Sequence, residues 1–332
     1  MNRVILSILV VLSLLTAFVA AAGYYVFHQL GQTTPTVVVF DIEPGSNLYE
    51  ITDRLVHESV IEVDDTVLKA YALLTRNQGT IKAGQYEVSD GLDVPGLLSL
   101  FRSGRVMQHQ VTFPEGWTFT QWRQRLSEQP FMSHETTGFS RSDIAQVLGI
   151  SGNPEGWLFP DTYTYTKGDS DLEILLLAYQ KMQEELDAAW QRRGPVTGVH
   201  SPYDALILAS VIEKETGYEP DRAKIASVFQ NRLAIGMKLQ SDPTIIYGLG
   251  DSFDGDLKRS HLRTDQPYNS YTRPGLPPTP ICSPGRASLE AALAGSMHPY
   301  MYFVAKGNGE SHFSLTLDEH NRAVNQYQRN QP

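Results

Sequence analysis

Residues 201–217 read SPYDALILASVIEKETG, and this stretch predicts an apolar helix that ends in two glutamates. Ser201 can cap the start of the helix, and Pro202 suits its first turn. Gly217 is a natural residue at which a helix stops. Carboxylates are rarely buried, so two of them at the end of an apolar helix mark a candidate functional site.

The two glutamates, Glu213 and Glu215, differ in the helix face that they occupy. At 3.6 residues per turn, Glu215 continues an apolar stripe formed by Leu208, Val211 and Ile212, whereas Glu213 lies on another face. Burial and the negative end of the helix dipole would both raise the pKa of Glu215. A carboxyl that stays protonated near neutral pH can act as a general acid. The structural alternative is an ion pair with a nearby Arg or Lys, because such pairs also perturb pKa values.

Composition limits the classes of function. The 332 residues are enough for about two domains, and the net charge of 27 − 37 = −10 argues against a broad nucleic-acid interface. The single Cys282 excludes an intrachain disulfide and a multi-cysteine metal site. His261, His298, His312 and His320 form no close ligand pair such as His-x-x-x-His. We therefore expect neither a metal nor another cofactor.

The N-terminal region predicts a membrane anchor. Residues 4–27 contain no charged residue and are long enough to cross a bilayer as one helix. Arg3 precedes this run and the next Lys or Arg is Arg54, so the positive-inside rule places the N-terminus in the cytoplasm and the remainder outside. A cleaved signal peptide is the alternative, because residues 20–22 are three alanines. The length of the run and the tyrosines at 24–25 favour a retained anchor.

The remainder of the chain predicts an α+β protein. We expect a cytoplasmic N-terminus and transmembrane helix in residues 1–27, a polar linker at 28–36, a small α+β subdomain at 37–90 and a larger α+β domain at 91–332. The small subdomain has the order strand, helix, helix, strand. In the larger domain, apolar periodicity predicts helices at 94–101, 142–148, 171–193 and 220–235, and strands at 111–113 and 300–305. The Gly-Asn-Gly at 307–309 is a hairpin signal.

A series of motifs resembles a known family. They are EGWLFPDTY at 155–163, EKET at 213–216, ASVFQNRL at 226–233, LQSDPTIIYG at 239–248, YNSY at 268–271 and GLPP at 275–278. In this order and spacing the chain resembles the endolytic murein transglycosylases, the MltG or YceG-like family, over nearly its whole length.

The resemblance implies a single-pass enzyme of the inner (plasma) membrane, with a LysM-like subdomain at 37–90 and a periplasmic catalytic domain at 91–332. A small spacer is the alternative to a glycan-binding LysM module. Such lyases cut peptidoglycan strands between N-acetylmuramic acid and N-acetylglucosamine. The muramic acid 6-hydroxyl attacks its own C1, leaves a 1,6-anhydro end and consumes no water. Cleavage of nascent strands would end their elongation, and penicillin-binding protein synthases are the partners that the resemblance implies.

The resemblance also assigns roles to individual residues. Related lytic enzymes place the catalytic Glu before a Ser, so Glu215 before Thr216 matches, whereas Glu213 before Lys214 does not. Intramolecular attack needs no positioned water, so one Glu can serve as acid and then as base. We expect Asn231 and Arg232 to fix the helix rather than to contact substrate. The expected substrate-binding residues are Glu155, Gln240, Ser241, Asp242, Tyr268, Asn269 and Tyr271.

Several of these residues have a structural alternative. Asp242 before Pro243 is a common turn opener, the tyrosines of 268–271 could pack on one another, and Glu155 could cap a loop. Two other functions stay open as well. One is a lysozyme-like hydrolase that pairs Glu215 with Glu155 or Asp242. The other is a non-catalytic scaffold that binds glycan.

Overall fold

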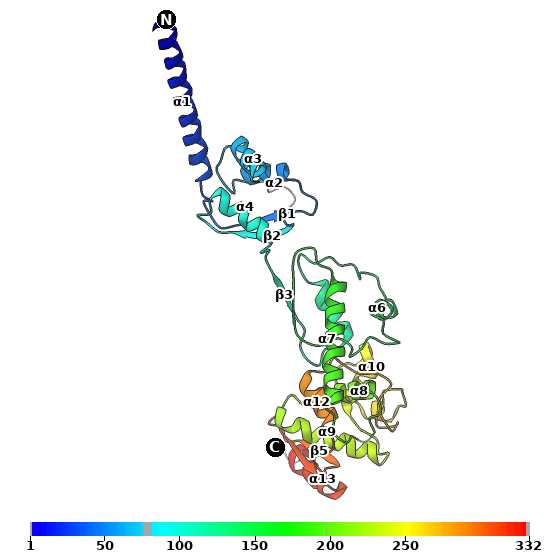
Figure 1. The fold of residues 1–332 in the computed structure, drawn as a ribbon. Coiled ribbons are helices and arrows are strands. Elements are labelled where there is room, and N and C mark those ends of the chain that lie inside the picture. Colours follow the sequence, from blue (N-terminus) through cyan, green and yellow to red (C-terminus); the bar gives the residue numbers. More distant parts are fainter. Residues whose placement is uncertain (1, 76–80, 197, 330–332) are drawn as a thin grey trace. The chain divides into compact units, whose positions relative to one another are not determined.

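The computed structural model describes residues 2–75, 81–196 and 198–329. The chain divides into two compact units, one formed by Met1–His109 with Thr164–Asp169 and the other by Gln110–Tyr163 with Ser170–Pro332. Helices and two-stranded antiparallel sheets make up both units, so the predicted α+β class is confirmed (Figure 1). In the first unit the elements are α1 (Asn2–Leu30), β1 (Val38–Ile42), α2 (Leu48–His57), α3 (Asp65–Leu74), β2 (Gly84–Val88) and α4 (Val94–Ser103).

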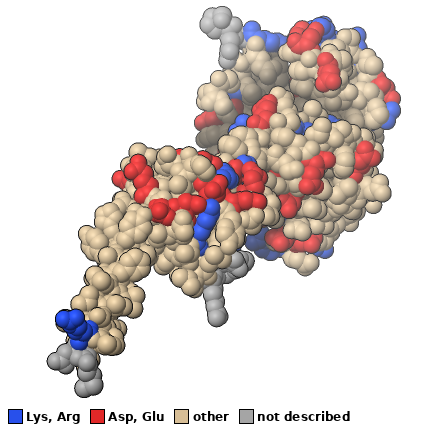
Figure 2. All heavy atoms as spheres, turned by 90° about the horizontal axis from the view of Figure 1, so that it is seen from above, with Lys and Arg blue, Asp and Glu red and all other residues tan. Residues whose placement is uncertain are grey.

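Helix α1 is long and apolar enough to cross a membrane. Within the segment Arg3–Leu30, the most apolar window of 18 residues has a mean hydropathy of 2.8, and none of that window is buried by the rest of the chain. Figure 2 shows the helix as an arm of uncharged residues with basic atoms only near its tip. Length and composition agree with the predicted anchor, and a signal sequence near an N-terminus would meet the same criteria.

The predicted order strand, helix, helix, strand is found in the first unit. Strands β1 and β2 pair antiparallel, with Phe40 opposite Tyr86. Phe101 of α4 stacks on Phe40 at 5.6 Å and meets the edge of Tyr86 at 5.0 Å between ring centroids. Because α4 completes this core, the unit continues to His109, whereas the sequence predicted a boundary at residue 90.

Residues 28–36, predicted as a polar linker, are built into the first unit. Thr34 is buried, and its hydroxyl donates to the carbonyl of Ser89 (2.6 Å) and accepts the N–H of Leu92 (3.0 Å). At the end of α1, the side chain of Gln29 accepts the N–H of Asp64 at 2.7 Å. Hydrogen bonds of this kind tie the end of α1 to the small unit, so the anchor helix continues directly into folded structure.

The second unit contains most of the helices. Its elements are α5 (Phe119–Ser127), α6 (Arg141–Leu148), α7 (Asp171–Gln191), α8 (Pro202–Glu215), α9 (Glu219–Ala234), α10 (Asp242–Leu249), a 3₁₀ turn (Gly250–Ser252), α11 (Arg259–Arg263), α12 (Arg286–Leu293), β5 (Tyr302–Ala305), β6 (Ser311–Ser314), α13 (Leu317–Val324) and a π-helical turn (Asn325–Arg329). The remaining sheet pairs β3 (His109–Thr112) with β4 (Thr162–Tyr165). The helices predicted at 142–148, 171–193 and 220–235 correspond to α6, α7 and α9.

Helix α8 is the centre of this unit. It packs against α7, α9, α10 and α12 (Figure 1), and every residue from 205 to 212 is buried. The apolar stripe predicted for one face therefore extends around the whole helix. The helix ends at Glu215 because Thr216 is extended (φ −149°, ψ 132°), so the chain turns one residue before the predicted stop at Gly217.

Two predicted features near the C-terminus form one hairpin. Strand β5 pairs antiparallel with β6, with Phe303 opposite Phe313, across the Gly-Asn-Gly turn at 307–309. Helix α13 follows and packs against both strands. This hairpin and helix supply one wall of the cavity described next.

Candidate active site

Glu215 lies at the edge of a polar cavity of about 500 Å³ in the second unit. It is the last residue of α8 and its side chain is half-buried. Burial raises the pKa of Glu215 to about 7, with a further contribution from the charge of Asp242. A hydrogen bond from Ser241 and the charge of Arg232 act in the opposite direction. Near neutral pH the carboxyl is therefore divided between its protonated and ionised forms.

Ser241 connects Glu215 to α10. It is 1% exposed and precedes the helix at the N-cap position, but its hydroxyl donates to Oε1 of Glu215 instead of capping α10. Its N–H donates to Oγ of Ser270 at 2.9 Å, and Thr244 donates to its carbonyl at 2.7 Å. Asp242 and Pro243, which the sequence allowed to be a turn, form the first turn of a helix, where proline is favoured.

Gln240 adopts a strained backbone conformation beside the cavity. Its φ of 51° lies in the left-handed region that residues other than glycine rarely adopt. Its N–H donates to the carbonyl of Ser270 at 3.1 Å, which fixes the backbone, and the exposed side chain lines the cavity. Strain held in place next to a site is typical of functional regions.

Tyr271 and Asp242 meet on the same side of the cavity. The hydroxyl of Tyr271 donates to Oδ1 of Asp242 at 2.6 Å, and both residues line the cavity. Burial raises the pKa of Tyr271, and the bond to Asp242 raises it further. Of the predicted site residues, the structure thus brings together Glu215, Gln240, Ser241, Asp242 and Tyr271.

Arg232 both supports the backbone and lines the cavity. Its Nε donates to the carbonyl of Met301 (2.8 Å) and its Nη1 to that of Leu239 (2.5 Å), while its guanidinium lies over the ring of Tyr302 at 5.3 Å. Burial lowers the pKa of Arg232. Asn231 has only the supporting role, because its amide donates to the carbonyls of 298 and 300 at 2.9 Å.

The opposite wall of the cavity comes from the C-terminal hairpin and α13, which the sequence did not assign to the site. His320 stacks on Tyr302 at 5.3 Å between ring centroids. Burial, Arg232 and His312 lower the pKa of His320, which favours its neutral form. The wall consists of Tyr302, Phe303, Val304, Ala305, Ser311, Leu317, His320, Asn321, Val324 and Gln328. Local patterns predict the hairpin, but they carry no signal that it lines a cavity with Glu215.

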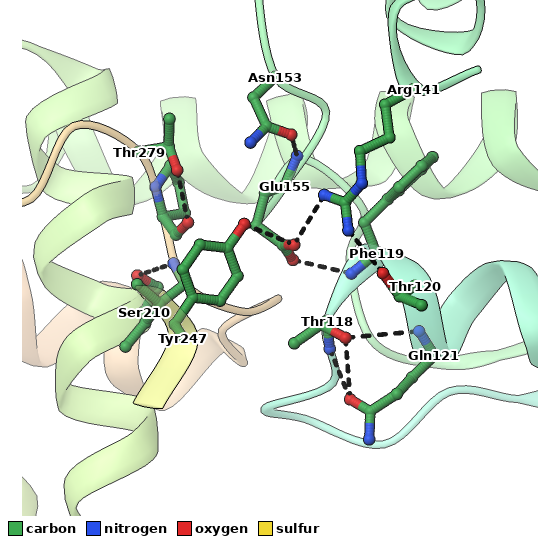
Figure 3. A network of polar contacts seen from close by, with 12 residues as sticks. Thr118, Phe119, Thr120, Gln121, Arg141, Asn153, Glu155, Ser210, Tyr247 and Thr279 are labelled. Carbon is green, nitrogen blue, oxygen red and sulfur yellow. Dashed lines mark hydrogen bonds and ion pairs between the residues drawn. The ribbon is translucent and has the colours of Figure 1, made fainter. Parts of the chain in front are cut away.

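Glu155 lies in a separate buried network (Figure 3), and it does not line the cavity. It is 0% exposed. Its Oε1 accepts the N–H of Phe119 at 2.8 Å, and its Oε2 accepts the hydroxyl of Tyr247 at 3.0 Å and Nη1 of Arg141 at 3.4 Å. Burial raises its pKa. Glu155 thus joins the first turns of α5 and α6 to α10, in keeping with the structural alternative of a capping residue.

Tyr268 and Asn269 also lie outside the cavity lining. The hydroxyl of Tyr268 is 2.9 Å from Oγ1 of Thr279. Asn269 is 0% exposed, and its amide donates to the carbonyls of 261, 262 and 264. Its Oδ1 accepts the N–H of Tyr271 at 2.9 Å, so it orients the one tyrosine of this loop that reaches the cavity.

Glu213 points to a different environment from that of Glu215. Its Oε2 accepts the N–H of Gly285 at 3.0 Å, just before α12. Glu115 lies close to the same glycine, and burial together with the charge of Glu213 raises the pKa of Glu115. Neither glutamate lines the cavity. Among the described residues, no group of three or more His, Cys, Asp or Glu side chains is placed to hold a metal ion.

Comparison with known proteins adds a family to this geometry. A family model described as the YceG-like family matches residues 40–326. An endolytic murein transglycosylase of Bacillus subtilis (strain 168) is 33% identical over 325 residues, which cover 92% of this chain and 89% of the relative. An endolytic murein transglycosylase of Streptococcus pneumoniae serotype 2 is 26% identical, with 96% of this chain and 64% of the relative covered.

A solved structure agrees with these relatives. The crystal structure of a putative YceG-like protein from Listeria monocytogenes matches with a TM-score of 0.54 and 30% identity. The match covers 87% of this chain and 100% of the other. Sequence and fold therefore relate this chain to the same group of proteins along most of its length.

Proposed function

The chain belongs to the YceG-like family, and from this premise we propose that it is an endolytic murein transglycosylase. It is a lyase that cuts peptidoglycan strands between N-acetylmuramic acid and N-acetylglucosamine. The relatives that carry this name match the chain along most of its length. The observation that carries the proposal is a carboxyl with a pKa of about 7, Glu215, at the edge of a polar cavity.

Glu215 is the proposed acid and base. Protonated Glu215 donates its proton to the glycosidic oxygen as the bond from C1 of the muramic acid to that oxygen breaks. The 6-hydroxyl of the same muramic acid then forms a bond to C1, and its proton passes to the Glu215 carboxylate. The products are a 1,6-anhydro end and a free hydroxyl on the leaving sugar. The carboxyl returns to its starting state and no water is consumed.

The surroundings of Glu215 suit both steps. Burial favours the protonated form, which the first step uses, whereas Ser241 and Arg232 favour the carboxylate, which the second step uses. A pKa near the working pH is the best compromise for a group that must give and then take a proton. The charge of Arg232 acts on Glu215 and Tyr271, which both line the cavity.

Gln240, Asp242 and Tyr271 are the proposed sugar-binding residues. They supply amide, carboxylate and phenol groups to the cavity, and these match the hydroxyl and N-acetyl groups of the substrate. We propose a positioning role for Glu155, Tyr268 and Asn269, because their polar atoms bind protein groups away from the cavity.

The proposed location is the outer side of the plasma (inner) membrane, with α1 as a single-pass anchor and the N-terminus in the cytoplasm. The apolar segment Arg3–Leu30 and the preceding Arg3 support this orientation. We propose that the LysM-like subdomain, predicted at 37–90, includes α4 of the first unit, that the catalytic domain, predicted at 91–332, is the second unit, and that penicillin-binding protein synthases supply the strands. The last two proposals follow from the family resemblance.

Mass spectrometry of digested peptidoglycan tests the function. The wild-type chain should release fragments that end in 1,6-anhydro-muramic acid, and Glu215→Gln should release none while it stays folded. Glu213→Gln is the matched control, because it changes a carboxyl two residues away that binds Gly285 outside the cavity. Reducing ends without anhydro sugars would instead indicate a hydrolase, with Asp242 as the second carboxylate. Unchanged release by Glu215→Gln would indicate a non-catalytic role for that residue.

A further inference from the structure

Trp117 stands apart from the other three tryptophans of the chain. Trp122 stacks on Phe113 at 3.7 Å, Trp157 stacks on Tyr203 at 5.7 Å, and Trp190 lies under the guanidinium of Arg193 at 4.1 Å. Within residues 2–75, 81–196 and 198–329, the Trp117 ring has no such partner and its indole N–H has no acceptor. An aromatic ring that the fold itself does not use is available to a ligand.

The backbone holds Trp117 in a fixed position. The N–H of Ser283 donates to the carbonyl of Trp117 at 2.8 Å, and the N–H of Gly116 donates to the carbonyl of Ser283 at 2.9 Å. Gly116, at φ 77°, makes the tight turn that precedes the tryptophan. The main chain that carries the ring is therefore fixed, so ligand binding has to order only the Trp117 side chain.

Polar side chains of α5 and of its C-cap residue line a hollow together with the ring. A hollow of about 250 Å³ is lined by Trp117, Gln121, Gln124, Arg125 and Glu128. Their spacing of three or four residues places them on one face of the helix. Gln124 donates to Glu128 at 3.1 Å, and Arg125 lies 4.0 Å from the other oxygen of Glu128. The opposite charges leave the hollow without net charge, which suits a neutral ligand.

Sugars bind to sites that combine an aromatic face with amide and charged side chains. The ring can stack on the C–H face of a pyranose, while the side chains of Gln121, Gln124 and Arg125 can bind hydroxyl and N-acetyl groups. The hollow is smaller than the roughly 300–1,000 Å³ of a pocket for a whole drug-sized ligand. It therefore suits one part of a polymer, and a glycan strand extends beyond the sugars at Glu215.

We propose that the hollow at Trp117 is a second glycan-binding site, which holds an N-acetylated sugar of the strand outside the Glu215 cavity. This site rests on the proposed function. The two sites share a support, because Nζ of Lys214, the neighbour of Glu215, donates to the carbonyl of Gly116 at 3.3 Å. Binding at the hollow would hold a long strand in position for cleavage at Glu215. It would not affect the cleavage of a fragment too short to reach both sites.

Calorimetry with a soluble oligomer of N-acetylglucosamine tests the site. The full chain in detergent carries Glu215→Gln, so that no substrate is consumed. Adding Trp117→Ala should weaken binding about tenfold, through loss of the stacking surface, and Trp117→Phe should weaken it less. Tyr49→Ala, which removes an exposed aromatic of the first unit, is the matched control and should bind like the parent. Equal affinities for Trp117→Ala and the parent would overturn the proposal.

Two further measurements keep the result clear. Gln124→Ala changes an exposed side chain and should weaken binding about threefold, so it replaces Trp117→Ala if that variant fails to fold. Release of the 1,6-anhydro product, measured with the chain that keeps Glu215, separates the two proposals. Normal release with binding that does not depend on Trp117 would refute the second site alone. Binding that depends on Trp117 without any anhydro product would refute the proposed function and leave the second site standing.

Discussion

The hydroxyl of Ser241 donates a hydrogen bond to Oε1 of Glu215, although Ser241 occupies the N-cap position of α10. A serine at this position ordinarily accepts an N–H of the first turn, an interaction that stabilises a helix by about 1 kcal/mol. Here the second residue of the first turn is Pro243, which has no N–H, and the hydroxyl of Thr244 binds the Ser241 carbonyl. The local structure of α10 thus leaves the hydroxyl free to bind the carboxyl at the end of α8.

Ser241→Ala should change the pH dependence of cleavage. The hydrogen bond lowers the pKa of Glu215, so its removal should raise that pKa. Because proton donation needs the protonated acid, the decline of kcat/KM at high pH should move to higher pH, while kcat near neutrality should fall about tenfold. A pH–rate profile measures both effects. Ser252→Ala, which removes an exposed serine hydroxyl after α10, should leave the profile unchanged, and an unshifted profile for Ser241→Ala would contradict the assignment.

Glu215 should lower stability in alkaline solution. Folding raises its pKa from 4.5 to about 7, so the native state holds the proton more tightly than the unfolded chain. The free energy of unfolding should therefore decrease as the pH rises from 4.5 to about 7, and the decrease should be complete above that range. Glu215→Gln should be about 2 kcal/mol more stable than wild type at about pH 8 and no more stable at about pH 4.

Urea unfolding at the two pH values provides the measurement. Glu213→Gln serves as the comparison, since it makes the same chemical change outside the cavity. If the free energies of unfolding of Glu215→Gln and wild type differ by the same amount at both pH values, the pKa of Glu215 is not raised by folding.

The sequence predicts the elements better than their contacts. The order strand, helix, helix, strand of the first unit follows from local periodicity, and so do α6, α7 and α9. The helix face predicts the difference between Glu215 and Glu213 less well, because α7, α9, α10 and α12 bury α8 on all sides. What distinguishes Glu215 from Glu213 is its contact with Ser241, a residue 26 positions away in sequence.

The rest of the site depends on tertiary packing. Proline is common both after a turn opener and in the first turn of a helix, so Asp242 and Pro243 by themselves do not predict the start of α10. The cavity wall with Tyr302 and His320 comes from a hairpin and helix whose local sequence does not say what they pack against. Glu155 and Asn269 have the polar groups of a substrate site, and only their burial and hydrogen bonds reveal that they bind protein atoms.

Glu155→Gln should reduce stability and activity together. The carboxylate accepts hydrogen bonds from Phe119, Tyr247 and Arg141, and an amide cannot accept all three. We expect a loss of about 3 kcal/mol in the free energy of unfolding, with a lower kcat because α10 shifts. Tyr247→Phe removes one of these bonds and should cost about 1 kcal/mol. A higher KM at unchanged stability would instead indicate that Glu155 contacts the substrate.

Gln240 offers a test in which stability and activity should change in opposite directions. Its φ of 51° is unfavourable for any residue with a Cβ, whereas glycine adopts it freely. Gln240→Gly should therefore raise the free energy of unfolding by about 1 kcal/mol, yet it removes an amide that lines the cavity and should raise KM. Gln240→Ala is the matched control, because it removes the same amide and keeps the strain. Both variants should show the same rise in KM, and only the glycine variant should melt at a higher temperature. If Gln240→Gly keeps the wild-type KM, the side chain does not bind substrate and the strained backbone alone shapes the approach to Glu215.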